Sequence, residues 1–457
     1  MSRSFQRRSA APPPGPPEEL PTGRLRRLRL WMVPGMGVKR HVALAVGGGL
    51  LAAAGAVSTI LWLLADARAS VAQPIERVLV SGPWRTVGGV VSVAALLAGV
   101  ALLVWAIVRL NRSLLSNWMP RPREAAAVLH RRLLLSRGPR LVAFGGGTGL
   151  SNLLRGLRMA SSNLTAVVTV SDDGGSSGRL RRAFDMPAPG DLSDCLAALS
   201  DHEVELGRLM DYRFERGDEL TGHTFGNLLI TTLVEVEGDL GRATRVLNRV
   251  LHLAGAVWPV TSASTTLVAT KRDGTRVAGE SRLREEPGAV AGLTLDPPDP
   301  PALPEVLAAI HDADLIVLGP GSLFTSVVAP VLVPEVRAAL VQAKAPVVYV
   351  CNIMTEAGET DGMDAMAHVH ALHDHLDRWP DLVLVNDAPV DPDRRAAYRR
   401  EEAEEVAVRP DLFVKAGVAF RTAPLIGRGP FAQHDPTRLA EELVGLAVAA
   451  RSGEALR

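Results

Sequence analysis

Residues 141–157 read LVAFGGGTGLSNLLRGL, which is an apolar run, a glycine cluster and a second apolar run. This order predicts a buried strand, a tight turn and a helix. Glycines let the backbone approach a phosphate closely, and the first N–H groups of a helix stabilise its negative charge. The candidate ligand contacts are Gly145, Gly146, Gly147, Thr148 and Gly149. A strand-to-helix turn without a ligand is the simpler alternative.

Further apolar runs without polar alternation follow, as is typical of strands buried on both faces of a parallel sheet. The predicted strands are Leu141–Phe144, Ala166–Val170, Leu315–Leu318, Val347–Cys351 and Leu382–Val385. Helix-length segments separate them, so we expect an α/β fold, a Rossmann-like and mostly parallel sheet with helices on both faces. Residues 257–280 differ, because Asp273-Gly274 between two β-branched runs predicts a hairpin and therefore a smaller inserted α+β portion.

A second motif, VVTVSDDGGSSGRLRR at 167–182, carries a strand into two carboxylates and a polar loop. Asp172 and Asp173 lie a little over 20 residues past the glycine cluster, near the place of a ribose-binding acid in dinucleotide folds. Alternatively, Asp173 and Asp191 hold a divalent metal such as Mg²⁺. Phosphate contacts are expected from Ser176, Ser177 and Arg179. A solvated turn is the competing interpretation.

Two further polar loops complete the predicted site. The string TGHTFGN at 221–227 offers His223 as a phosphate donor or acid/base and Asn227 as a hydroxyl reader, although either could simply cap a helix. The loop after the run at 315–318 offers a second anion cradle, formed by Gly319, Gly321, Ser322 and Ser326. Ligands in open α/β folds bind where two such loops meet at the carboxyl ends of strands.

Histidines 368, 370, 373 and 375 cluster in HVHALHDH, for which we favour a solvated helix over a metal site. The charged stretch at 393–406 predicts a solvent-facing helix.

The N-terminal third indicates a membrane. Residues 1–40 are basic and proline-rich and predict a disordered arm. Residues 42–64 and 86–108 are charge-free apolar runs, each long enough to cross a bilayer, so 41–110 should hold two transmembrane helices joined by a short external loop. Residues 111–138 are expected to form a juxtamembrane linker. Arginines flank the pair on both outer sides, which places both termini and the globular domain in the cytoplasm.

The composition limits the kinds of partner and compartment that we expect. The 457 residues include 50 Lys or Arg and 49 Asp or Glu, a balance that argues against a nucleic-acid partner. The two cysteines, Cys195 and Cys351, show no paired spacing, which fits a reducing compartment.

Six ordered motifs resemble one family: GGGTGLSNLLRGL, TVSDDGGSSGRLRR, PGDLSDCLAALSD, HTFGNLLI, GAVWPVTSAS and GPGSLFTSVVAPVLVPEVRAAL. They are similar to the YvcK-like branch of the CofD superfamily, whose other branch contains 2-phospho-L-lactate transferases. The resemblance implies a nucleotide-sugar-binding domain over 139–445, followed by a tail at 446–457.

That resemblance implies a regulatory protein that binds a UDP-sugar, with UDP-N-acetylglucosamine the expected ligand. Such a protein would link gluconeogenic growth to cell shape through envelope or metabolic partners, as a homo-oligomer. A metal-dependent transferase that moves a phospho-acid from a nucleotide carrier is the alternative, so the sequence leaves open whether the chain is an enzyme. NAD-dependent chemistry ranks third, because the glycine cluster breaks the GxGxxG pattern.

Overall fold

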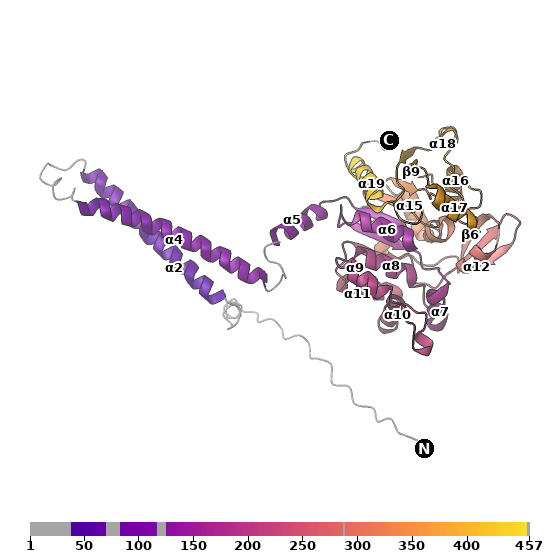
Figure 1. Cartoon of the computed structure of the whole chain (residues 1–457), viewed down its shortest axis with the longest axis horizontal. Coiled ribbons are helices and arrows are strands. Elements are labelled where there is room, and N and C mark those ends of the chain that lie inside the picture. The colour runs from indigo at the N-terminus through magenta and orange to yellow at the C-terminus, as the bar shows by residue number, and fades with distance from the viewer. Residues whose placement is uncertain (1–37, 70–82, 117–124, 287, 455–457) are drawn as a thin grey trace, which may run out of the picture. The chain divides into compact units, whose positions relative to one another are not determined.

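The computed structural model describes residues 38–69, 83–116, 125–286 and 288–454, and the chain divides into two units, Met1–His130 and Arg131–Arg457 (Figure 1). The predicted disordered arm lies outside the described residues except for 38–40, which belong to the first helix. The predicted external loop lies outside them over residues 70–82.

The first unit contains two long helices, α2 (Val38–Ala69) and α4 (Pro83–Ser116). Both are long and apolar enough to cross a membrane, over Arg40–Leu64 and Thr86–Ser113. They pack closely through small residues, because a Cβ on Gly99 would lie 2.3 Å from Ala52 N. Small residues at such contacts let two membrane helices approach each other. The predicted pair of spanning helices therefore agrees with the structure.

The second unit is built on a seven-stranded sheet in which all pairs are parallel. Its strand order is β10-β9-β8-β7-β1-β2-β3. The strands are β1 (Leu141–Gly145), β2 (Leu164–Val168), β3 (Ala256–Pro259), β7 (Leu315–Leu318), β8 (Val347–Val350), β9 (Leu382–Asn386) and β10 (Phe420–Ala423). The order matches a Rossmann sheet with one further strand at the β9 edge. The predicted Rossmann-like fold is confirmed.

Every predicted strand is present: Leu315–Leu318 has the predicted bounds, and the ends of the others shift by at most two residues. The two edge strands, β3 and β10, were not predicted. Edge strands are covered less completely than central ones, and both sequences, AVWP and FRTA, lack the long apolar run that marked the others.

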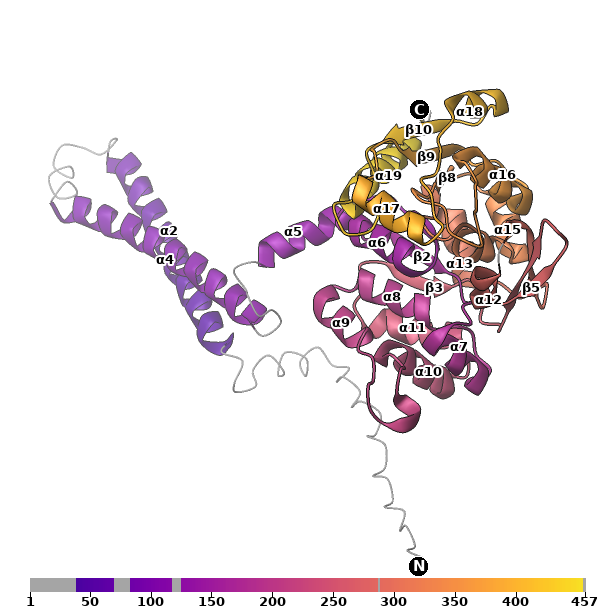
Figure 2. The same cartoon turned by 45° about the vertical axis from the view of Figure 1, so that its right-hand side comes forward.

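The inserted portion is a three-stranded antiparallel sheet in the order β5-β4-β6. The predicted hairpin is formed by β4 (Thr266–Lys271) and β5 (Arg276–Ala278), and β6 (Val290–Asp296) pairs with the other edge of β4. A short helix, α12 (Glu280–Glu285), connects β5 to β6. Figures 1 and 2 show α12 and these strands at one side of the second unit.

Helices cover both faces of the large sheet (Figure 2). In one group, α6 (Gly147–Leu157) packs against both α8 (Gly190–Leu199) and α19 (Pro436–Arg451). In another group, α15 (Pro334–Gln342) packs against both α13 (Pro304–Asp312) and α16 (Ala365–Leu376). The remaining helices are α5 (Ala125–Ser136), α7 (Gly175–Phe184), α9 (Glu203–Met210), η2 (Asp218–Leu220), α10 (Phe225–Glu237), α11 (Leu240–Val250), η3 (Leu323–Val328), α14 (Ala329–Val331), α17 (Pro392–Arg400) and α18 (Pro410–Ala416).

The histidine-rich helix, α16, corrects one expectation. His368 is fully buried, and His375 Nε2 accepts a hydrogen bond of 2.9 Å from Leu293 N. The helix is packed on one side rather than solvated, because Val369, Leu372 and Leu376 share its buried face. The charged helix α17 has no buried residue, as predicted, but it ends at Arg400, and Ala403 and Val406 in the rest of the predicted stretch are buried.

Candidate functional site

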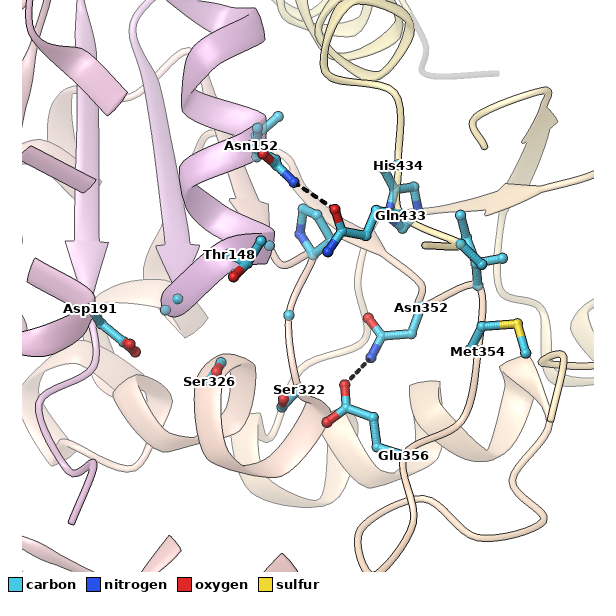
Figure 3. A pocket seen from close by; sticks show the side chains of 18 of the residues that line it. Thr148, Asn152, Asp191, Ser322, Ser326, Asn352, Met354, Glu356, Gln433 and His434 are labelled. Carbon is cyan, nitrogen blue, oxygen red and sulfur yellow. Dashed lines mark hydrogen bonds between the residues drawn. The ribbon is translucent and has the colours of Figure 1, made fainter. Parts of the chain in front are cut away.

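The candidate site lies at the point where the sheet order reverses. Strands β1 and β7 are neighbours, but the chain continues from β1 to β2 on one side and from β7 to β8 on the other. Loops that leave the two strands therefore diverge, which opens a crevice at their carboxyl ends. A cleft of about 470 Å³ occupies this crevice (Figure 3).

The first glycine loop forms one wall of the cleft. Gly146 is the extended N-cap of α6, and a Cβ there would lie 2.1 Å from Asp191 Oδ2. Gly147 has a φ of +53°, in the left-handed region that glycine adopts without strain. The Asp191 carboxylate accepts a hydrogen bond from the backbone of Gly147. The start of α6, with Thr148 exposed to the cleft, presents the N–H groups that a helix leaves without internal partners.

The second glycine loop is in direct contact with the first. A Cβ on Gly149 would lie 2.5 Å from Pro320 O, so only glycine lets the two loops approach this closely. Ser322 is the N-cap of η3, and both Ser326 N and Val327 N donate to Ser322 O, at 2.9 and 3.0 Å. This wide turn places Ser322 and Ser326 among the cleft residues (Figure 3). Two loops separated by more than 170 positions in the sequence thus form one cradle.

Five carboxyl groups line the cleft: Asp172, Asp191, Asp194, Glu280 and Glu356. Burial, with Asp172 and Asp194 nearby, raises the pKa of Asp191 to about 7. Burial, reinforced by Asp211, raises the pKa of Asp194 to about 6. This concentration of like charge repels an anionic ligand unless a cation or a proton neutralises it.

A single guanidinium faces these carboxyl groups. Arg284 of α12 is the one Lys or Arg side chain among the described residues that line the cleft. It donates to Glu280 Oε1 at 2.8 Å and lies 3.5 Å from Glu359 Oε1. Glu359 is fully buried, and burial together with Glu356 raises its pKa to about 7. The insertion therefore contributes the cleft's one guanidinium and holds it between two acids.

Several predicted residues lie beside the cleft rather than in its lining. The Asp173 carboxylate accepts a hydrogen bond of 2.8 Å from Ser281 N, at the start of α12. Ser176 Oγ contacts His223 Nδ1 at 2.9 Å and accepts from Asn227 Nδ2 at 3.1 Å in a buried network. The other residues outside the lining are Gly145, Ser177, Arg179 and Gly319.

The structure thus separates the two predicted metal ligands. Asp191 lies in the cleft with Asp172, whereas the carboxylate of Asp173 is used at the start of α12. No three His, Cys, Asp or Glu side chains converge on one point within the described part of the chain. A Mg²⁺ ion would therefore take one or two carboxylates here and complete its shell with water and ligand phosphates, which is its usual manner of binding.

The far end of the cleft was missed by sequence reasoning. Asn352 Nδ2 lies 3.5 Å from Glu356 Oε1, and Asn152 Nδ2 donates to Gln433 Oε1 at 3.2 Å across the cleft (Figure 3). The buried His434 has its pKa lowered to about 4 by burial, so the ring is neutral. Tyr398 also lines this end, and its hydroxyl accepts from Ala432 N at 3.2 Å.

Part of this end was open to prediction from the sequence. Asn352 and Glu356 follow a predicted parallel strand, where functional side chains collect. Gln433 and His434 precede the helix start at Asp435-Pro436 but show no motif, and Arg284 belongs to an ordinary charged segment, SRLREE.

Known proteins resemble the chain over most of its length. The sequence profile of the family described as 2-phospho-L-lactate transferase CofD matches residues 141–426. A Deinococcus radiodurans protein, provisionally named a gluconeogenesis factor, is 44% identical and covers 93% of this chain and 90% of its own length. A match of that extent includes part of the first unit.

Other relatives match about two thirds of the chain. The gluconeogenesis factor of Bacillus subtilis is 39% identical over 68% of this chain and 99% of its own. A Bacillus halodurans crystal structure superposes with a TM-score of 0.66 and 41% identity, and it covers 67% of this chain and 100% of that one.

Proposed function

Since this chain belongs to the CofD family, we propose that its cleft binds the pyrophosphate of a UDP-sugar, with UDP-N-acetylglucosamine the expected ligand, as a regulatory signal. The main support for the proposal is the contact between the two glycine loops at the point where the sheet order reverses. Gly149 lies so close to Pro320 there that no side chain would fit at position 149. Such backbone cradles at helix starts suit a diphosphate. The names of the relatives support a role in gluconeogenic growth.

We further propose that Mg²⁺ accompanies the ligand. The cleft offers five carboxyl groups and one guanidinium. Burial raises the pKa of Glu280 to about 9, so that group is protonated at neutral pH, but the other four acids still outnumber Arg284, and a pyrophosphate alone would meet net negative charge. A divalent ion held by Asp191 and Asp172 would neutralise negative charge on both the carboxylates and the pyrophosphate. The metal would supply charge compensation, while the glycine loops orient the phosphates and Arg284 supplies the remaining positive charge.

Two aspartates offer a matched test. Asp191→Asn should lower UDP-N-acetylglucosamine affinity strongly with Mg²⁺ present and much less in chelator, as measured by calorimetry on the full chain. Asp173→Asn should change affinity little in either condition, because asparagine Oδ1 still accepts from Ser281 N. Equal losses for the two variants, or no binding by the unsubstituted protein, would contradict the proposal. UDP, other UDP-sugars and NAD serve as competing ligands.

A transferase is the second candidate, favoured by one observation. Asp191 has a pKa of about 7 beside the phosphate cradle, so it can exchange a proton near neutral pH, as an acid/base group must. Incubation with Mg²⁺ and nucleotide-activated phospho-acids should then release free nucleotide. Ligand binding without release of free nucleotide would contradict the transferase and support the regulatory function.

We place the second unit in the cytoplasm, with both termini on that side. The arginines outside the two apolar helices support this orientation. We also propose that the protein contacts envelope or metabolic proteins and that it forms a homo-oligomer.

A further inference from the structure

Helix α5 exposes an apolar face. The exposed fractions of Leu129, Leu133 and Leu134 are 51%, 54% and 55%. At 3.6 residues per turn these three side chains occupy an arc of about 140° on one side of the helix. Single exposed leucines are ordinary on protein surfaces, but three within one arc of a short helix form an unpartnered face.

The other side of α5 is fixed to the second unit. Leu135 O accepts a hydrogen bond of 3.0 Å from Ser162 N, and Ser136 O accepts one of 2.9 Å from Asn163 Nδ2. Arg132 Nη2 lies 3.4 Å from Asp201 Oδ2. The attachment of the helix therefore does not use the leucines, and its geometry holds them outward.

Chain length and charge identify the occupant of this face. Only residues 117–124 separate α4 from α5, and even a fully extended chain of that length reaches about 30 Å. Seven arginines and a single acidic residue lie between positions 109 and 137. Basic segments beside a spanning helix are attracted to anionic headgroups. Arg131 and Arg132 lie on the two sides of the leucine arc, where they add positive charge beside it even though Arg132 also pairs with Asp201.

We propose that the leucine face of α5, formed by Leu129, Leu133 and Leu134, inserts into the boundary between headgroups and acyl chains of an anionic lipid leaflet. The bilayer is the one that α2 and α4 cross, so the inference rests on the proposed membrane location. An amphipathic helix of this kind lies in the plane of the interface. The insertion attaches the second unit to the membrane surface through α5.

Single cysteines test the insertion in the full chain, reconstituted into vesicles of phosphatidylcholine and phosphatidylglycerol. The native Cys195 and Cys351 are both buried, so an introduced surface thiol can be labelled with a nitrobenzoxadiazole fluorophore. Leu133→Cys reports the proposed face. Leu97→Cys, 64% exposed on α4, reports the spanning region, and Val414→Cys, 76% exposed on α18, reports the aqueous surface.

We expect spin-labelled lipid to quench the fluorophore at positions 97 and 133 and not at 414. Adding Leu129→Ser and Leu134→Ser should abolish quenching at 133 alone, and these exposed positions should leave the melting temperature unchanged. Quenching at 97 but not at 133 would overturn the inference and leave the membrane span intact. Absence of quenching at 97 would instead overturn the membrane location. A probe at 133 shielded from both lipid and aqueous quenchers would indicate a second copy of the chain on this face and would also overturn it.

Discussion

At the residue scale, the site depends on glycines whose missing side chains set the distance between loops. Gly149 and Gly445 both lie in helices, but a Cβ at 149 would meet Pro320 O at 2.5 Å, whereas one at 445 would meet nothing within 4 Å. The same substitution therefore has opposite consequences at the two positions.

We predict that Gly149→Ala lowers both the melting temperature and nucleotide-sugar affinity, because it forces the two glycine loops apart. Overpacking of this kind costs about 1–3 kcal/mol. Gly445→Ala should leave binding unchanged and raise the melting temperature slightly, since alanine favours a helix by roughly 0.5–1 kcal/mol over glycine. Thermal melts and calorimetry on both variants check the prediction. Wild-type affinity in a folded Gly149→Ala protein would show that the contact between loops is dispensable.

The buried carboxyl of Asp191 gives a second prediction at this scale. Its pKa rises from 3.8 to about 7 on folding, so the folded protein holds a proton that the unfolded chain has released between those pH values. Its contribution therefore destabilises the fold progressively as pH rises from about 4 to about 7. Asp191→Asn removes this penalty. The variant should melt higher than the unsubstituted protein at pH 7.5 and nearly equally at pH 4, while it binds ligand less well in Mg²⁺. A gain that is the same at both pH values would show that ionisation is not its cause.

At the element scale, α12 and the loop after β8 are joined by one buried lysine. Lys271 Nζ donates to Glu286 O at 2.9 Å, Gly288 O at 2.7 Å and Gly358 O at 2.8 Å. These carbonyls belong to the segment after α12 and to the loop that carries Glu356 and Glu359. The lysine therefore fixes the insertion, and with it Arg284, against the wall of the cleft.

We predict that Lys271→Met loosens this junction, because methionine fills the space of the lysine stem but leaves the carbonyls unpaired. An unsatisfied buried polar group costs about 1–3 kcal/mol. Hydrogen exchange should accelerate in the peptide around 279–290 more than in the central strands. Lys344→Met, at an exposed lysine, is the matched control and should exchange like the unsubstituted protein. Uniform acceleration across the second unit would mean that the lysine supports the whole fold rather than this junction.

At the scale of the whole molecule, two physically different units share one chain. The first contains two helices that are long and apolar enough to cross a membrane, and the second has a buried core around a parallel sheet. A helix that crosses a bilayer is not released by washing, because its removal would expose about 20 apolar side chains to water.

We predict that the chain stays in the membrane fraction through an alkaline carbonate wash. A tag placed after Arg457 should resist external protease in intact cells and become cleavable once the cells are opened. Release by carbonate would contradict the spanning helices, whereas cleavage of the tag in sealed cells would contradict only the orientation.

The sequence alone determined the features that depend on local pattern. Long charge-free runs predict helices that are long and apolar enough to span a membrane. Buried strands such as Leu315–Leu318 can be recognised because both of their faces are covered by protein, which requires a continuous apolar run. The first glycine loop was predicted for the same reason, since a strand, glycines and a helix follow one another directly along the chain. The edge strand β10 was missed because its residues are only partly covered.

Only the tertiary structure decided which of the predicted polar residues share one cleft. Asp172 and Asp173 are adjacent in sequence, yet the first lines the cleft and the second accepts from Ser281 N beside α12. Arg284 and His434 reach the cleft from an insertion and from the segment before α19, and no local pattern distinguishes them. The physical reason is that strand order, and with it the place where loops diverge, is fixed by long-range pairing and packing of the whole sheet. The local sequence around a residue does not determine that arrangement.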